Sequence, residues 1–185
     1  MMKEISLAGK TALITGGATG IGYAIAGEMC DAGADVVIVG RRAEKLREAA
    51  QNLGSHCRWY QFDVTQTEGY ESLLDQIEEQ APIDILVNNA GINIKKDFFD
   101  FKAEEFDRIV ETQAKAPFML SQAVAERMKS RKGGNIIFIS SLASILGMDE
   151  IQAYTVCKRG TKGVARSVAR DLGPYGIRVN RLNPG

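Results

Sequence analysis

The sequence contains one set of side chains suited to proton transfer at a carbonyl or an alcohol. Tyr154 and Lys158 are four residues apart in a segment with a helical pattern, so they share one face of the helix. A phenol exchanges its proton poorly at neutral pH, but a neighbouring ammonium stabilises the phenolate and makes the exchange easier. Ser141 ends an apolar, strand-like run and could hydrogen-bond the reacting oxygen. Because the tyrosine–lysine spacing is common on helices by chance, the surrounding elements decide its meaning.

A glycine-rich turn near the N-terminus indicates where a nucleotide would bind. The segment 15–22 (TGGATGIG) follows an apolar run and precedes a helical pattern. Unpaired N–H groups and the positive end of the helix dipole favour phosphate at such a place. Gly16 suits the tight turn, Gly20 lets a pyrophosphate approach, and Gly22 lets the helix pack close to the strand. The spacing differs from Gly-x-Gly-x-x-Gly, so a turn without a ligand is the alternative.

Two arginines follow the second apolar run, where dinucleotide-binding folds carry an acidic residue for the ribose hydroxyls. These residues are Arg41 and Arg42. A carboxylate would repel a 2′-phosphate, whereas a guanidinium can bind it with two charged hydrogen bonds. The pair therefore favours NADP. A solvated helix start is the alternative, because arginine is common at surface turns.

Polar residues also end the third and fourth apolar runs. Asp63, followed by Val64, could accept a hydrogen bond from an adenine amino group. It could equally be a turn residue before an N-cap at Thr65, with Glu68 completing a capping box. The segment 88–91 (NNAG) offers small and amide residues that suit a backbone pressed against a planar ligand, or a simple turn.

A long helical stretch carries a glutamine on its apolar face. Gln113 needs a hydrogen-bond partner once it is buried. Pro117, four residues later, cannot donate to the Gln113 carbonyl and should kink the helix there. An amide beside a freed carbonyl could hold a water, and a satisfied glutamine in a packing helix is the alternative. The residues of this face are Phe106, Ile109, Val110, Gln113, Pro117, Leu120, Val124 and Met128.

Short apolar runs alternate with helical patterns along the whole sequence. This order predicts an α/β fold, a doubly wound parallel sheet of Rossmann-like type in three layers. Central runs are almost continuously apolar, as in strands covered on both faces. With no repeat or linker, residues 1–185 are predicted to form a single domain. The predicted strands are 11–15, 35–39, 58–62, 83–87, 135–140 and 177–182, and the predicted helices are 20–32, 43–53, 67–80, 104–129 and 152–172.

The composition argues against several classes of function. Lys plus Arg and Asp plus Glu both number 23 among 185 residues, which argues against nucleic acid or an anionic membrane as the main partner. No apolar segment reaches membrane-spanning length, and residues 1–7 lack the core of a secretion signal. Three widely separated cysteines favour a reducing cytoplasm over a disulfide framework. A single histidine, His56, gives little support to a metal site or a histidine triad.

Together, these motifs resemble the short-chain dehydrogenase/reductase family of the Thr-Gly-x-x-x-Gly-x-Gly type. The resemblance extends over residues 10–185 with the motifs in the family's order: the glycine-rich turn, Asp63-Val64, Asn88-Asn89-Ala90-Gly91, Ser141, Tyr154-x-x-x-Lys158 and Asn183-Pro184-Gly185. It implies hydride transfer between a nicotinamide and a small carbonyl or secondary alcohol. It also implies that Tyr154 exchanges the proton, that Ser141 polarises the reacting oxygen, and that Lys158 binds the nicotinamide ribose and assists the tyrosine.

The resemblance further implies a cofactor site and an assembly. Such proteins are commonly homotetramers or homodimers built on the two long helices, here 104–129 and 152–172. The segment 91–96 (GINIKK) is similar to sugar-acid dehydrogenases of the family. NADP is the expected cofactor and NAD the second choice. The expected cofactor-binding residues are Thr15, Gly16, Thr19, Gly20, Ile21, Gly22, Arg41, Asp63, Val64, Asn89, Ala90, Gly91, Tyr154, Lys158, Pro184 and Gly185.

Two departures from the family pattern affect these expectations. Gln113 stands where the family usually has an asparagine in a proton relay, and its extra methylene predicts an altered but not abolished relay. The sequence stops at Gly185, where the family usually continues with a nicotinamide-contacting threonine, a substrate lid and a further strand. If Gly185 were the true terminus, strand 177–182 would lie at a sheet edge, but we expect instead that the sequence is part of a longer protein. A cofactor-binding protein without turnover is the alternative function, and a scaffold with an empty turn is a third.

Overall fold

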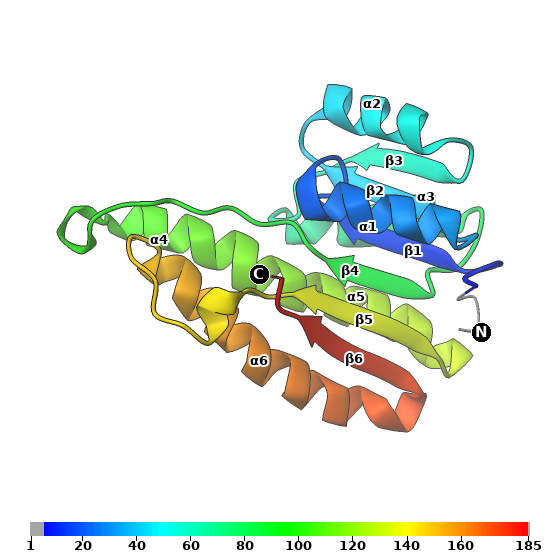
Figure 1. The fold of residues 1–185 in the computed structure, drawn as a ribbon. Coiled ribbons are helices and arrows are strands. Elements are labelled where there is room, and N and C mark those ends of the chain that lie inside the picture. The colour runs from blue at the N-terminus through cyan, green and yellow to red at the C-terminus, as the bar shows by residue number, and fades with distance from the viewer. Residues whose placement is uncertain (1–5, 185) are drawn as a thin grey trace, which may run out of the picture.

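The computed structural model describes residues 6–184, which form one parallel sheet with helices on both faces (Figure 1). The sheet has six strands in the order β3-β2-β1-β4-β5-β6. The strands are β1 (Thr11–Thr15), β2 (Asp35–Gly40), β3 (Cys57–Gln61), β4 (Ile85–Asn88), β5 (Gly134–Ile139) and β6 (Ile177–Leu182). The α-helices are α1 (Gly20–Asp31), α2 (Ala43–Leu53), α3 (Tyr70–Glu78), α4 (Ala103–Val110), α5 (Ala116–Arg131) and α6 (Gln152–Leu172). This is the doubly wound, Rossmann-like fold that the sequence predicts.

Short helical turns complete the structure. A π-helical turn, η3 (Glu111–Lys115), joins α4 to α5. The 3₁₀ turns are η1 (Thr67–Gly69), η2 (Phe98–Asp100), η4 (Leu142–Ser144) and η5 (Gly173–Tyr175). No helix within residues 6–184 is long and apolar enough to cross a membrane.

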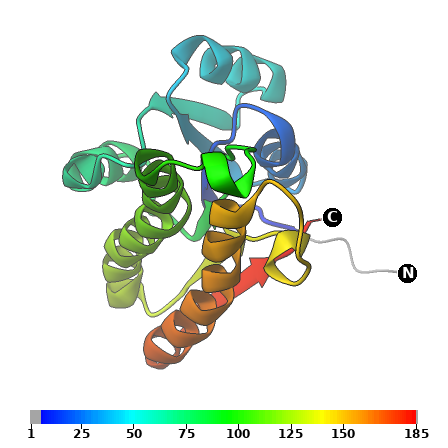
Figure 2. The same ribbon diagram turned by 90° about the vertical axis from the view of Figure 1, so that its left-hand side faces the viewer.

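The sheet buries a separate core on each face because successive strand residues point to opposite sides. Leu13 of β1 lies in register with Val37 and Leu86, and all three pack with residues of α3, α5 and α6. The next residue, Ile14, lies in register with Ile38 and Val87 and packs with residues of α1 and α2. Figure 2, seen from the side to which α4 projects, shows these helices on either side of the sheet. Three layers result.

The strand order reverses between β1 and β4. From β1 the chain continues outward to β2 and β3, whereas β4, β5 and β6 follow one another on the other side. Ligands in open α/β sheets bind at the carboxyl ends of the strands where the order reverses. The glycine-rich turn follows β1 and the NNAG segment follows β4, so both predicted motifs lie at this point.

The long helix predicted over 104–129 is interrupted by the π-helical turn. The N–H of Ala116 donates to the carbonyl of Glu111, five residues earlier. Pro117 has no N–H to donate to the Gln113 carbonyl, so the regular hydrogen-bond pattern changes at this point. Most of the predicted apolar face is buried, whereas Phe106 at its N-terminal end is 38% exposed. It lies on α4, which projects beyond the sheet (Figure 1).

The helix predicted from residue 67 begins later, and its predicted cap is wrong. Residues 67–69 form the 3₁₀ turn η1, whose N-cap is Gln66, and α3 starts at Tyr70. Thr65 does not cap a helix. Its hydroxyl donates to the Asp63 carboxylate at 2.9 Å, which ties the residues after β3 into a turn. The capping box with Glu68 is therefore absent.

Strand β6 forms one edge of the sheet in the described part of the chain. It pairs with β5 alone among the described strands. Ile177 is buried against the core, whereas Leu182 at the other end is 52% exposed. The apolar residues of this strand are thus covered only in part.

Candidate active site

The side chain of Thr15 joins the turn after β1 to the end of β4. Its Oγ1 accepts hydrogen bonds from the N–H groups of Asn89 and Ala90, each at 3.0 Å, and donates to the Val87 carbonyl. The Asn89 amide donates in return to the carbonyls of Thr15 and Gly16 at 3.0 and 3.2 Å. Thr15 is 3% exposed and lines neither of the two cavities described below, so its role is to support the turn and the end of β4 from within the fold.

Gly22 allows the first turn of α1 to approach this junction. A Cβ at residue 22 would overlap the Asn89 amide and the Gly16 carbonyl. Gly22 therefore lets α1 pack closely against the glycine-rich turn and the end of β4. Gly16 and Gly20 adopt left-handed φ angles of 67° and 56°, which shape the turn itself. Thr19 is the N-cap residue of α1 but makes no side-chain cap bond, so its side chain leaves the N–H groups of the first turn open.

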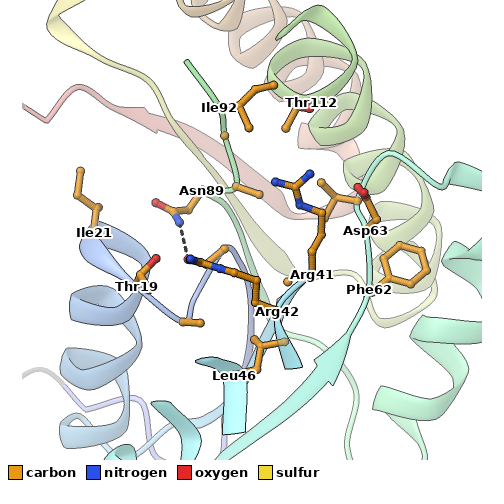
Figure 3. Close-up of a pocket in the computed structure, with 16 residues that line it drawn as sticks. Thr19, Ile21, Arg41, Arg42, Leu46, Phe62, Asp63, Asn89, Ile92 and Thr112 are labelled. Atoms are coloured by element: carbon orange, nitrogen blue, oxygen red, sulfur yellow. Dashed lines mark hydrogen bonds between the residues drawn. The ribbon is translucent and has the colours of Figure 1, made fainter. Parts of the chain in front are cut away.

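A cavity of about 350 Å³ lies over the turn and the ends of β2, β3 and β4 (Figure 3). Arg41 and Arg42 extend into it from the end of β2. Arg42 is also the N-cap residue of α2, and both arginines are exposed. The two alternatives for these arginines are therefore compatible, because they lie at a solvated helix start and also line the cavity. The predicted residues that line this cavity are Gly16, Thr19, Ile21, Arg41, Asp63, Val64, Asn89, Ala90 and Gly91.

The segment after β3 is held rigidly at the rim of this first cavity. The Asp63 carboxylate accepts hydrogen bonds from the N–H and hydroxyl of Thr65, at 3.0 and 2.9 Å. The hydroxyl of Tyr70 donates to the Val64 carbonyl at 2.5 Å and lies 3.2 Å from the Ala116 carbonyl. Asp63 is thus a turn residue and a cavity-lining residue at once.

A second cavity, of about 480 Å³, contains the side chains with the potential for proton transfer. Tyr154 and Lys158 line it from α6, and Ser141 lines it from the end of β5. It shares Ile21, Asn89, Gly91 and Ile92 with the first cavity, so the two adjoin. A ligand in the first cavity could therefore reach Tyr154 without leaving the protein surface.

Lys158 is buried, with only 6% of its surface exposed. Its Nζ donates to the Ile139 carbonyl at 2.7 Å and lies 5.4 Å from the centre of the Tyr154 ring. Burial lowers the pKa of Lys158 to about 8, because the ammonium has lost most of its water. Ser140 fixes the same turn of α6 by donating to the Lys158 carbonyl at 3.1 Å. The structure therefore brings the amine and the phenol together, as their spacing predicts.

Ser141 has a fixed hydroxyl at the mouth of the second cavity. It is the N-cap residue of η4, and its Oγ accepts a hydrogen bond from the N–H of Ala143 at 3.1 Å. A serine hydroxyl that accepts one bond can still donate its own hydrogen. Ser141 can therefore donate to an oxygen atom in this cavity.

Gln113 is 4% exposed and has one half of its amide satisfied. Its Nε2 donates to the Ile92 carbonyl at 2.6 Å. Its Oε1 is buried without a hydrogen-bond partner among the described residues. A Cβ at Gly91 would lie 2.8 Å from this oxygen, so glycine there makes room for the amide. Gln113 lines the second cavity together with Lys158, and a buried acceptor of this kind calls for a donor.

The remaining residues named in the sequence analysis are placed as follows. Pro184 lines the second cavity, whereas Gly185 lies outside the described residues. His56 is exposed, pairs with Asp35 and lines neither cavity. The position of a loop at the carboxyl end of a strand could have pointed to several lining residues that the sequence motifs missed. These are Ala18, Gly40, Leu46, Phe62, Ile92 and Thr112 in the first cavity, and Asn93, Ile139, Ser140, Leu142, Leu146 and Met148 in the second.

Known proteins are similar to this chain in sequence and fold over nearly its whole length. The 5-keto-D-gluconate 5-reductase of Escherichia coli (strain K12) is 37% identical over 184 residues, which cover 97% of this chain and 72% of that protein. The 3alpha-hydroxysteroid dehydrogenase of Mediterraneibacter gnavus is 36% identical over 185 residues, covering 97% of this chain and 74% of the relative.

A solved structure and a family model extend these similarities. A candidate NAD(P) dependent gluconate 5-dehydrogenase from Beutenbergia cavernae, with bound NADP at low occupancy, is 30% identical with a TM-score of 0.92. The match covers 99% of this chain and 74% of that one. The family model for short chain dehydrogenases matches residues 10–185. The chain is therefore an oxidoreductase of the short-chain dehydrogenase/reductase family.

Proposed function

We propose that this protein is an NADP-preferring oxidoreductase that transfers a hydride between a nicotinamide and a small carbonyl or secondary alcohol. One observation carries the proposal: Tyr154, Lys158 and Ser141 border a single cavity that adjoins the cavity over the glycine-rich turn. Because both cavities lie on one sheet, we also propose that a single domain, residues 1–185, binds the cofactor and performs the chemistry.

The residues of the first cavity fit a dinucleotide phosphate. The open N–H groups at the start of α1 suit the pyrophosphate, and Asp63 and Val64 suit the adenine. Arg41 and Arg42 supply two guanidinium groups for a 2′-phosphate. When bound, NADP supplies the hydride donor or acceptor. The NADP in the structure from Beutenbergia cavernae supports this choice, with NAD as the second candidate.

In the reductive direction the side chains of the second cavity handle the oxygen and the proton. The Ser141 hydroxyl donates a hydrogen bond to the carbonyl oxygen and polarises it. The Tyr154 hydroxyl then gives its proton to that oxygen. Lys158, whose ammonium lies close to the Tyr154 ring, favours the phenolate that remains and is placed to bind the nicotinamide ribose. In the oxidative direction the same groups act in reverse.

Gln113 adds a relay position to this mechanism. Gln113 lines the same cavity as Lys158, and its Oε1 has no partner among the described residues, so a water bound to this oxygen could carry a proton away from the lysine. The glutamine side chain is one methylene longer than asparagine and is held by Ile92. We propose that Gln113 keeps such a relay working with altered geometry.

The molecule also offers a surface for self-association. A groove of about 640 Å³ runs between α5 and α6 and includes the exposed side chains of Phe118 and Tyr175. We propose that these helices form the interface of a homodimer or homotetramer, which light scattering of wild type and Phe118→Asp would test.

The three cysteines are unpaired, which supports a cytoplasmic location.

The proposed function is tested by titrating the protein with NADPH and with NADH, followed by a panel of carbonyl compounds. We expect tighter binding of NADPH and its oxidation by at least one carbonyl. Tight binding without oxidation across the panel would instead favour a cofactor-binding protein without turnover. Absence of binding would favour a scaffold and would contradict the proposal.

A further inference from the structure

The wall of the second cavity limits which carbonyl compounds fit, an argument that rests on the proposed function. We infer that the substrate is an uncharged aldehyde or ketone with an apolar chain or ring beside the reacting carbon. The two relatives described above are named for opposite classes, a sugar acid and a steroid, at nearly equal identity. Overall similarity therefore does not choose between them, and the residues of this chain must.

Three exposed apolar side chains are among the residues that line the second cavity and not the first. These are Leu142, Leu146 and Met148, which we call the apolar trio. They are 41%, 53% and 51% exposed, although each lines a cavity. An apolar ligand would remove this surface from water, and burial of apolar surface is favourable in proportion to its area. The hydroxyl groups of a sugar would gain little from contact with these side chains.

The second cavity contains no free cation for a carboxylate. Lys158 is the single charged residue among the described residues that line it. Its ammonium is buried, donates to the Ile139 carbonyl, and is assigned to the cofactor and Tyr154 in the proposed mechanism. A carboxylate placed against the apolar trio would lose water without gaining a charged partner, which is strongly unfavourable.

Three cations of the neighbouring segments, Lys96, Arg159 and Arg181, contact groups outside the cavity. Lys96 pairs with both carboxylate oxygens of Glu105, at 2.8 and 3.0 Å. Arg159 donates to the Ile145 carbonyl at 3.0 Å. Arg181 donates to the Asn183 side chain at 2.7 Å. Lys95 is exposed, and none of these cations lines the cavity.

The nearest charges along the segment that carries the apolar trio are negative. Asp149 and Glu150 directly follow Met148, and both are exposed. The carbonyl of Glu150 accepts a hydrogen bond from the N–H of Lys96 at 3.1 Å, which places this acidic stretch beside the segment that follows Gly91. These carboxylates repel an anionic substrate and leave a neutral one unaffected. Besides Ser141, Tyr154 and Lys158, the polar side chains that line the cavity are those of Asn89, Asn93, Gln113 and Ser140, and all four are neutral.

The test measures NADPH oxidation with a series of straight-chain 2-ketones from 2-butanone to 2-octanone and with 5-keto-D-gluconate. We expect kcat/KM to rise about fourfold with each added methylene that reaches the trio, the contribution of burying one methylene. We expect 2-octanone to exceed the sugar acid by at least about a hundredfold. A flat ketone series, or a preference for the sugar acid, would overturn this inference while leaving the proposed function intact. If none of the carbonyl compounds supports oxidation of NADPH, both this inference and the proposed function are overturned.

A charge placed in the wall sharpens the test. Met148→Arg gives the cavity the cation that it lacks, so the kcat/KM ratio of 5-keto-D-gluconate to 2-octanone should increase at least tenfold. Val156→Arg is the matched control, because Val156 is 56% exposed on α6 and lines neither cavity. It should leave the ratio unchanged. An equal change in both variants would mean that net charge and not the wall sets the preference, which would also overturn the inference.

Discussion

The two adjoining cavities at the carboxyl edge of the sheet differ in whether backbone or side chains shape them. The first is shaped mainly by backbone, because the turn after β1, the start of α1 and the end of β4 are joined by hydrogen bonds around Thr15 and Asn89. The second depends on side chains that come from α6, η3 and the segment after β5. The first can therefore bind a common ligand, while the second can vary in chemistry and specificity by exchange of side chains.

Burial separates the two cavities in the same way. The first cavity carries its cations on exposed arginines at the start of α2. The second cavity carries its cation on Lys158, which is only 6% exposed, and this burial lowers the pKa of the amine. Substitutions in the first cavity should change cofactor affinity, and substitutions in the second should change turnover or stability.

The largest effect is expected for Tyr154→Phe. Removing the hydroxyl removes the proposed proton donor, so kcat should fall about a thousandfold. NADPH affinity should stay within about twofold, because the ring beside Lys158 remains. Steady-state kinetics and a fluorescence titration with NADPH would measure both quantities. Tyr175→Phe, on the far groove between α5 and α6, is the control. Residual turnover above about a tenth of wild type would rule out Tyr154 as the acid.

The next effect concerns stability and its dependence on pH. Burial lowers the pKa of Lys158 from 10.5 to about 8, which costs the folded state about 3 kcal/mol while the amine is charged. Lys158→Met removes this cost but also loses the hydrogen bond to the Ile139 carbonyl, about 1 kcal/mol. The variant should abolish turnover yet raise the free energy of unfolding by about 2 kcal/mol at pH 6.

The sign of the pH dependence follows from the same shift. Between the folded and unfolded pKa values the unfolded chain binds more protons, so wild-type stability rises from pH 8 toward 10.5. The advantage of Lys158→Met should therefore be constant below pH 8 and disappear above it. Urea unfolding at pH 6 and pH 10 would measure this, with the exposed Lys162→Met as control. An advantage that persists at pH 10 would contradict the assignment to the charged amine.

A smaller effect is expected in the first cavity. Arg41→Ala or Arg42→Ala should weaken NADPH binding about tenfold each and leave NADH binding nearly unchanged, because only NADPH carries the 2′-phosphate. Arg47→Ala is the control, since Arg47 pairs with Glu44 on α2 and does not line the cavity. Isothermal titration with both cofactors would separate these cases. Equal losses for NADPH and NADH would show that the arginines do not recognise this phosphate.

The smallest effect is expected for Gln113→Asn. The shorter amide cannot reach the Ile92 carbonyl from the same position, so turnover and its pH profile should shift severalfold. Turnover rates between pH 5 and pH 10 would measure the shift, with the exposed Gln76→Asn as control. An unchanged rate and an unchanged profile would remove Gln113 from the relay.

Much of the first cavity could be predicted from the sequence. Local patterns determine a strand, a glycine-rich turn and a helix, and their order determines which strand ends meet. The strand prediction was therefore accurate to within one or two residues at most strand ends, and Gly16, Asp63 and Asn89 lie around one cavity as expected. The alternative with a turn at Asp63 followed by a cap at Thr65 was right about the turn and wrong about the cap, because the same residue types serve both.

The sequence by itself determined the order of strands and helices, the two-sided burial of the sheet, and the shared helical face of Tyr154 and Lys158. These properties depend on spacing along the chain. Only the tertiary structure decided that Lys158 is buried against Ile139, that the Gln113 oxygen has no partner among the described residues, and that Leu142, Leu146 and Met148 face a cavity. Those properties depend on contacts between segments far apart in the chain, which no local pattern specifies.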